Sequence, residues 1–122
     1  MKKLRQFLKF DHESFLKDKK FIVKETKPYF EYVNGEKTEK ELGTSVVCLV
    51  SEDNTKYADD EVAVNLFETI NFKVPGKQIE LAQQTAVKPV EILKASVYGQ
   101  FQNNLSIECA RIVKIDTNAT QN

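Results

Sequence analysis

The residues of this sequence that could do chemistry favour binding over catalysis. His12 is the only histidine among 122 residues, and no nucleophile in a recognisable catalytic motif accompanies it. The four glycines stand apart from one another, so no glycine-rich phosphate loop is present. Cys48 and Cys109 lie far apart within apolar stretches and lack the Cys-x-x-Cys spacing of a zinc site. We therefore expect two buried thiols, no metal, no cofactor and no enzymatic activity.

Aromatic side chains, amides and lysines are the remaining groups with a recognisable chemistry. Proteins that bind single-stranded nucleic acid without sequence preference stack the bases on aromatic rings and hold the phosphates with basic side chains. For each aromatic residue the alternative is a place in the core or in a lid over one end of the domain. The candidate nucleic-acid-binding residues are Phe30, Tyr32, Asn65, Phe67, Asn71, Lys73, Lys94, Tyr98 and Phe101. Further candidate phosphate contacts are Lys24, Lys27, Lys77 and Lys88.

The first half of the chain predicts two strands that lead into these candidates. Residues 21–33 are rich in aromatic and β-branched side chains, and residues 44–51 are almost continuously apolar. Between them, Asn34-Gly35 is a strong turn sequence, and the charged residues 36–41 are expected to extend it into a loop. The acidic and polar residues 52–61 predict a second, solvated loop.

Residues 62–74 show the clearest strand alternation in the sequence. Successive side chains of a strand point to opposite faces, so one set faces the core and the other faces outward. Glu68 interrupts the core-facing set, as Arg111 does in the last strand, and we expect these two residues to pair. The core-facing apolar residues are then Val62, Val64, Leu66, Ile70, Phe72 and Val74. The outward-facing residues include Asn65, Phe67, Asn71 and Lys73.

The second half predicts a helix and two more strands. Pro75-Gly76 ends the third strand, and residues 77–85 contain good helix formers. Strands follow at about residues 90–98 and 105–115, joined by a turn-rich tip at 98–104. This order predicts a mainly β fold, a five-stranded OB-fold barrel with one short helix between strands three and four and an N-terminal extension. A generic small β-barrel or sandwich is the alternative.

Charge is distributed unevenly along a chain whose formal net charge is zero. Residues 1–20 form a basic N-terminal arm or short helix, residues 21–116 the OB-fold domain, and residues 117–122 a flexible tail. The apolar residues of the arm have helical spacing and must dock on something. We expect the arm to contact a neighbouring subunit, DNA or its own barrel. The residues assigned to oligomerisation are Leu4, Phe7, Leu8 and Phe10.

Three pieces of the sequence give it a resemblance to known proteins. They are the aromatic strand with its Asn-Gly turn (28–37), Val-Pro-Gly at 74–76, and the closing segment 88–115. In this order they resemble small OB-fold single-stranded DNA-binding proteins of conjugative plasmids, conjugative transposons and phages. The resemblance implies largely sequence-independent binding of single-stranded DNA in conjugative transfer or in phage or plasmid replication.

The alternative function is a protein-interaction adaptor module of a mobile element that binds no nucleic acid. The zero net charge and the acidic residues 52–61 favour it, whereas the aromatic residues and the strand order favour single-stranded DNA. No apolar run approaches the roughly 18 residues that span a membrane, and the basic start lacks the apolar stretch of a signal peptide. We therefore expect a cytoplasmic protein without a membrane partner.

Overall fold

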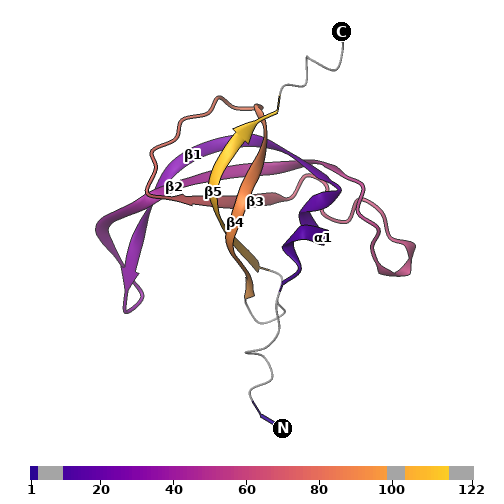
Figure 1. Ribbon diagram of the computed structural model, residues 1–122, viewed down its shortest axis with the longest axis horizontal. Helices are drawn as coiled ribbons and strands as arrows, with labels where there is room; N and C mark the ends of the chain where they lie inside the picture. Colours follow the sequence, from indigo (N-terminus) through magenta and orange to yellow (C-terminus); the bar gives the residue numbers. More distant parts are fainter. Residues whose placement is uncertain (3–9, 99–103, 116–122) are drawn as a thin grey trace.

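A computed structural model describes residues 1–2, 10–98 and 104–115 (Figure 1). The strands of this described part are β1 (Lys19–Val33), β2 (Glu36–Asp53), β3 (Thr69–Pro75), β4 (Ala86–Tyr98) and β5 (Asn104–Lys114). Its helices are the short α1 (His12–Lys17) and the single 3-10 turn η2 (Ala58–Asp60). The prediction of a mainly β fold with five strands and one short helix is confirmed.

The five strands form one sheet that closes into a ring in the order β1-β2-β3-β5-β4. The neighbouring strands are antiparallel except β3 and β5, which pair in parallel. The ring closes where β4 returns to β1, with Phe21 opposite Val87 and Ile22 opposite Ala86. The contacts of β1 with β4 and of β3 with β5 consist of two residue pairs each, whereas the antiparallel hairpins are paired over most of their length.

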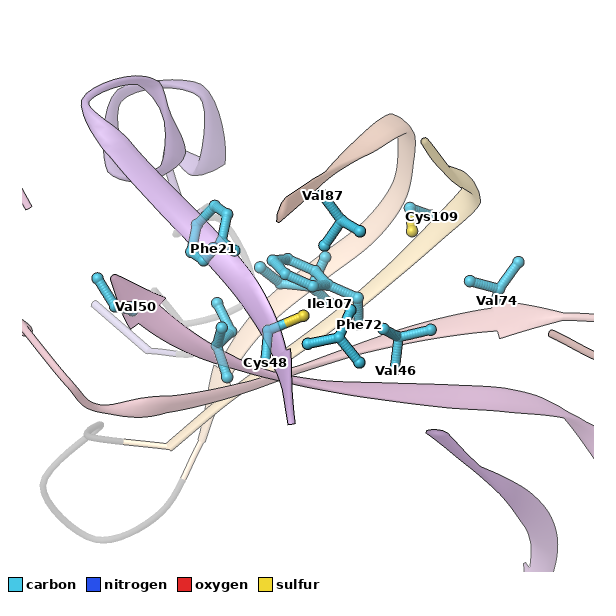
Figure 2. Close-up of a cluster of buried hydrophobic side chains, with 11 residues drawn as sticks. Phe21, Val46, Cys48, Val50, Phe72, Val74, Val87, Ile107 and Cys109 are labelled. Atoms are coloured by element: carbon cyan, nitrogen blue, oxygen red, sulfur yellow. The ribbon is translucent and has the colours of Figure 1, made fainter. Parts of the chain in front are cut away.

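The core fills the inside of the ring and draws on every strand (Figure 2). Ile70, Phe72 and Val74 of β3 point inward, as the alternation predicts. The ring of Phe21 meets that of Phe72 edge-on, with centroids 5.1 Å apart. Both cysteines are buried free thiols, as expected. Burial, with the nearby Cys109, raises the pKa of Cys48 to about 12, and burial raises that of Cys109 to about 11.

The hairpin between β1 and β2 is longer than predicted and projects beyond the ring (Figure 1). Asn34 and Gly35 form the turn with positive φ angles of 52° and 82°, as the Asn-Gly sequence predicts. The prediction of a loop at residues 36–41 is wrong, because β2 starts at Glu36 and pairs at once with Val33. A two-residue turn of this type matches the strand twist, so pairing continues through charged residues that water surrounds on both faces.

The strand prediction for residues 62–74 is right only from Thr69 onward. Residues 62–68 instead form consecutive turns, with Leu66 N donating to Ala63 O and Glu68 N donating to Asn65 O. Val62 and Val64 are therefore exposed, not core. Their alternation is accidental, because backbone groups of this segment bond to a side chain and to their own turns.

The expected pairing of Glu68 with Arg111 is also wrong. Both residues are exposed, and no ion pair joins them in the described part of the chain. Glu68 lies before β3 begins, so it does not share the core-facing register from which the pairing was inferred.

The helix predicted between strands three and four is absent from residues 77–85. The buried hydroxyl of Thr44 bonds to this segment twice, donating to Lys77 O and accepting from Ile79 N. At its other end, Gln84 N donates to Val23 O. These bonds take backbone groups that a helix would need, and a helix this short has little intrinsic stability to compete with them.

The α-helix of the described residues, α1, lies in the predicted N-terminal extension, before β1. Asp11 caps α1 by accepting a hydrogen bond from Ser14 N at 3.2 Å. Phe15 and Leu16 of α1 pack against the core cluster. Phe10, one of the residues assigned to oligomerisation, packs against Phe15 with ring centroids 5.2 Å apart and ring planes tilted by 59°. The other three, Leu4, Phe7 and Leu8, lie outside the described residues.

Candidate nucleic-acid interface

A transverse line of polar side chains runs round the outside of the ring, through all five strands. Lys27 of β1 pairs with Ser45 of β2, Ser45 with Lys73 of β3, Lys73 with Glu108 of β5, and Glu108 with Lys94 of β4. Residues directly opposite one another in a sheet share a face. Because the next residues along β3 and β5 point into the core, this whole line faces outward. We call these five residues the lysine row.

The lysine row holds three positive charges and one negative charge. Lys27 and Lys94 are exposed, and Lys73 is half-buried. Lys27 Nζ lies 3.7 Å from Glu25 Oε1, but both side chains are more than half exposed, so the pair is weak. The lysine row is therefore locally positive although the whole chain is formally neutral, with Lys27 and Lys73 flanking β2 and Lys94 farther round the ring, beyond β5.

The middle strand of this face carries small side chains between longer ones. Ser45 and Val47 point outward from β2 yet are buried, because side chains of β1 and β3 flank them. At Gly43 even a Cβ atom would collide with the carbonyl oxygen of Val74. The absence of a side chain there lets β2 and β3 approach closely beside the lysine row.

Aromatic rings continue from the lysine row into the projecting hairpin. Lys73 Nζ lies 5.4 Å from the ring centroid of Tyr29, and Lys37 Nζ lies 4.4 Å from that of Phe30. Tyr32 pairs with Lys37 across the hairpin and is 64% exposed. Tyr29 shares the strand parity of Lys27, whereas Phe30 and Tyr32 have the opposite parity and point to the other face of β1. Ammonium groups thus lie over aromatic rings at two neighbouring places, and single-stranded nucleic acid requires both kinds of group.

Tyr29 lies beside the lysine row, although it was not among the candidate residues predicted from the sequence. Burial, and then the nearby carboxylate of Glu108, raise the pKa of the Tyr29 hydroxyl. The side chain therefore stays protonated and can donate a hydrogen bond near the lysine row. Tyr29 has the same strand parity as Lys27, so alternation along β1 is the feature that could have identified it.

The structure brings some of the predicted contact residues together and separates others. Asn71, Lys73 and Lys94 lie on the outer face of the ring, and Phe30 and Tyr32 lie in the hairpin. Tyr98 ends β4 opposite Asn104, while Phe101 lies outside the described residues. The two remaining candidates, Asn65 and Phe67, are not on the outer face of a strand as predicted, because β3 starts only at Thr69.

Asn65 belongs instead to a buried polar network at the other end of β2. Its backbone N–H donates to Asp53 Oδ2 at 3.0 Å, and its side-chain amide donates to the Tyr57 hydroxyl at 2.9 Å. Tyr57 in turn donates to Asp53 Oδ2 at 2.6 Å. Asn65 therefore stabilises the connection between β2 and β3, and its side-chain amide is already hydrogen-bonded there.

The centre of this network is an ion pair between Lys19 and Asp53, whose side chains are 0% exposed. Lys19 Nζ lies 3.6 Å from Asp53 Oδ1 and donates to Phe15 O and to Thr55 Oγ1. Burial acts to raise the pKa of Asp53, but hydrogen bonds from Tyr57, Asn65 and Thr55 outweigh it and lower that pKa to about 2. Asp53 is therefore ionised at neutral pH and holds its partners firmly.

Comparison with protein-family models, with curated proteins and with solved structures finds no match to this chain. Within residues 1–2, 10–98 and 104–115, no helix is long and apolar enough to cross a membrane. The same residues contain no cluster of three or more histidine, cysteine, aspartate or glutamate side chains that could hold a metal ion. The proposal for the function of this protein therefore starts from the lysine row and the aromatic residues of the projecting β1–β2 hairpin.

Proposed function

We propose that this protein binds single-stranded DNA, largely independently of sequence, on the outer face of β2 and β3. The lysine row carries the proposal, because cross-strand register brings Lys27 and Lys73 to either side of β2, with the ring of Tyr29 near Lys73 Nζ. A cytoplasmic role in conjugative transfer or in phage or plasmid replication is proposed from the sequence resemblance.

The strand order supports assigning the ring to the OB-fold class. OB-folds are five-stranded Greek-key barrels, in which the strands are not all neighbours in chain order. In this ring β5 likewise lies between β3 and β4. That class binds oligonucleotides on the face of strands two and three, framed by the loops between strands one and two and between strands four and five. Ser45 and Lys73 of the lysine row are on β2 and β3, with Lys27 beside them on β1, and the projecting hairpin joins strands one and two; both features support this assignment.

The chemistry of the proposed interface divides between the two kinds of side chain. The ammonium groups of the lysine row neutralise phosphates, and this contribution weakens with salt as counterions are released. Phe30 and Tyr32 offer faces to unstacked bases, each stack being worth about 1–3 kcal/mol by alanine substitution. Neither contact reads base identity, so the proposed binding tolerates any sequence.

Charge reversal within the lysine row tests this proposal. Lys73→Glu/Lys94→Glu should weaken binding to a fluorescent oligo-dT strand by about tenfold or more, measured by anisotropy at low salt, and should flatten the salt dependence. The matched control is Lys17→Glu/Lys114→Glu, which makes the same change in net charge at exposed positions on α1 and at the end of β5.

The comparison between the two variants decides the outcome. If only the lysine-row variant loses affinity while both variants keep the wild-type melting temperature, the proposal stands. Equal binding by both variants would refute it, since affinity would then depend on net charge rather than on this face.

A further inference from the structure

The loop between β2 and β3, residues 54–68, is fixed at its base. Asp53, at the end of β2, accepts hydrogen bonds from Thr55 N, Tyr57 Oη and Asn65 N, which reach both arms of the loop. Asn54 N also donates to Asp18 O at 2.8 Å. Figure 1 shows the loop projecting on the side of the ring opposite to the β1–β2 hairpin. We call residues 54–68 the anchored loop.

The anchored loop displays apolar side chains that a monomer would be expected to bury. Val62 is 82% exposed, Val64 46% and Phe67 67%. Exposed apolar side chains gathered in one short segment mark interaction surfaces more often than isolated ones do. The core described above contains none of these three residues.

The backbone that displays these side chains is strained. Ala63 and Phe67 have positive φ angles of 53° and 65°, and Asp59 and Asp60 also lie in the left-handed region. Such a conformation costs about 1 kcal/mol or more for a residue other than glycine. The Asp53 network holds the loop in this form, so the exposed apolar side chains are presented on a fixed frame.

The charge next to the apolar side chains indicates the kind of partner. Asp59, Asp60 and Glu61 are exposed and directly precede Val62. A segment that complements them must be basic and must carry apolar side chains. Residues 1–10 of this same chain have that composition, with four basic residues, no acidic residue and apolar residues at helical spacing. The basic residues are Lys2, Lys3, Arg5 and Lys9.

We propose that residues 1–10 of one copy dock on the anchored loop of a second copy. The C-terminal end of α1 contacts the base of the anchored loop, where Asn54 N donates to Asp18 O. An arm docked on a neighbouring copy joins molecules, whereas an arm docked on its own loop leaves a monomer, so the oligomeric state tests the proposal directly. Such a contact joins two different surfaces, so it adds copies head to tail rather than closing a symmetric dimer.

The proposal also reassigns Phe67, from a base-stacking residue to an anchor for a protein segment. Phe67 N donates to Val50 O, beyond the Leu49–Thr69 pair that ends the pairing of β2 with β3. Lys73 lies six residues away along the chain, toward the hairpin end of the sheet. The surface that joins copies and the surface that binds DNA are thus at different ends of the sheet and can be tested separately.

Sedimentation velocity of the full chain without DNA tests the contact. We expect wild-type protein to self-associate with rising concentration and to dissociate with rising salt. Val62→Ser/Phe67→Asn should weaken the association by about tenfold or more, as removal of an aromatic anchor does. Asparagine at position 67 tolerates the positive φ angle, so the loop keeps its conformation. Leu93→Ser, at an exposed apolar residue of β4, is the matched control and should associate as wild type does.

A charge exchange identifies the two partners. Lys2→Glu/Lys3→Glu/Arg5→Glu and Asp59→Lys/Asp60→Lys/Glu61→Lys should each be monomeric alone, and an equimolar mixture should associate again because opposite charges are restored. A wild-type protein that stays monomeric, or a mixture that does not associate, would overturn the proposal. Lys73→Glu/Lys94→Glu should associate as wild type does, so failure of this proposal is distinguishable from failure of DNA binding.

Discussion

Two places along the β1–β2 ribbon each pair a lysine with a carboxylate, in very different surroundings. At one end Lys19 pairs with Asp53 out of contact with water, within a network of hydrogen bonds. Farther along β1, Lys27 meets Glu25 in a pair that is more than half exposed. A buried lysine is committed to its protein partners, whereas an exposed one can exchange a weak partner for a ligand. Burial, not residue type, separates the charge that holds this structure together from the charge that is free to meet a ligand.

Removing the buried carboxylate should give the largest effect in this comparison. Asp53→Ala leaves the Lys19 ammonium group buried without its counter-charge, and losing one partner of such a pair costs about 3–5 kcal/mol. Glu25→Ala, at the exposed pair, should cost less than about 1 kcal/mol. Urea unfolding followed by circular dichroism measures both free energies of unfolding.

A double variant sharpens the interpretation of that result. Lys19→Met/Asp53→Leu replaces both charges with apolar side chains and should be less destabilising than Asp53→Ala, because no unpaired charge stays buried. Similar losses for Asp53→Ala and Glu25→Ala would show that the buried network does not hold the anchored loop.

The pH dependence of stability should show the same contrast. Asp53 has a pKa of about 2 in the folded protein, against an ordinary value of 3.8. As pH falls below about 4, the unfolded chain takes up a proton before the folded protein does, so stability present above that pH is lost progressively toward pH 2. Melting temperatures across this range should fall more steeply for wild type than for Asp53→Asn. Parallel curves would contradict the assigned role of Asp53.

Exposed aromatic side chains in the hairpin should affect binding without affecting stability. Tyr32→Ala should weaken oligo-dT binding by about 1–3 kcal/mol, the range for one stacked base. Its melting temperature should stay within about 2 °C of the wild-type value, since loss of an exposed side chain changes stability little. Val33→Ala, at the next residue and also exposed, is the matched control. An equal loss of affinity in both variants would indicate that the hairpin contributes by shape rather than by stacking.

Local sequence patterns predicted much of the fold because they act within one strand. Alternation placed Ile70, Phe72 and Val74 in the core, and Asn34-Gly35 in a hairpin turn. The same rule failed at Val62 and Val64 because the carboxylate of Asp53, distant in sequence, bonds to the backbone of that segment. The helix expected at 77–85 failed for the same kind of reason, since Thr44 takes its backbone groups.

The candidate site was predicted residue by residue, but not as an arrangement. Lys73 and Lys94 were selected from the sequence, whereas their alignment with Lys27 through Ser45 and Glu108 depends on the register of four strand pairs. Register is set by the packing of the whole sheet, so no single strand encodes it. Lys19 and Asp53 looked like two more solvated charges, because nothing in the sequence indicates that β1 and β2 bury them together.

The central claim is that the charged and aromatic outer face binds single strands. Its most direct test is fluorescence anisotropy of the wild-type protein with a labelled oligo-dT strand and with its duplex, across a series of salt concentrations. We predict tight binding to the single strand that weakens with salt, by about 0.7 in the logarithmic slope for each phosphate neutralised, and weak binding to the duplex. No binding to the single strand at low salt, or equal binding to both forms, would contradict the claim.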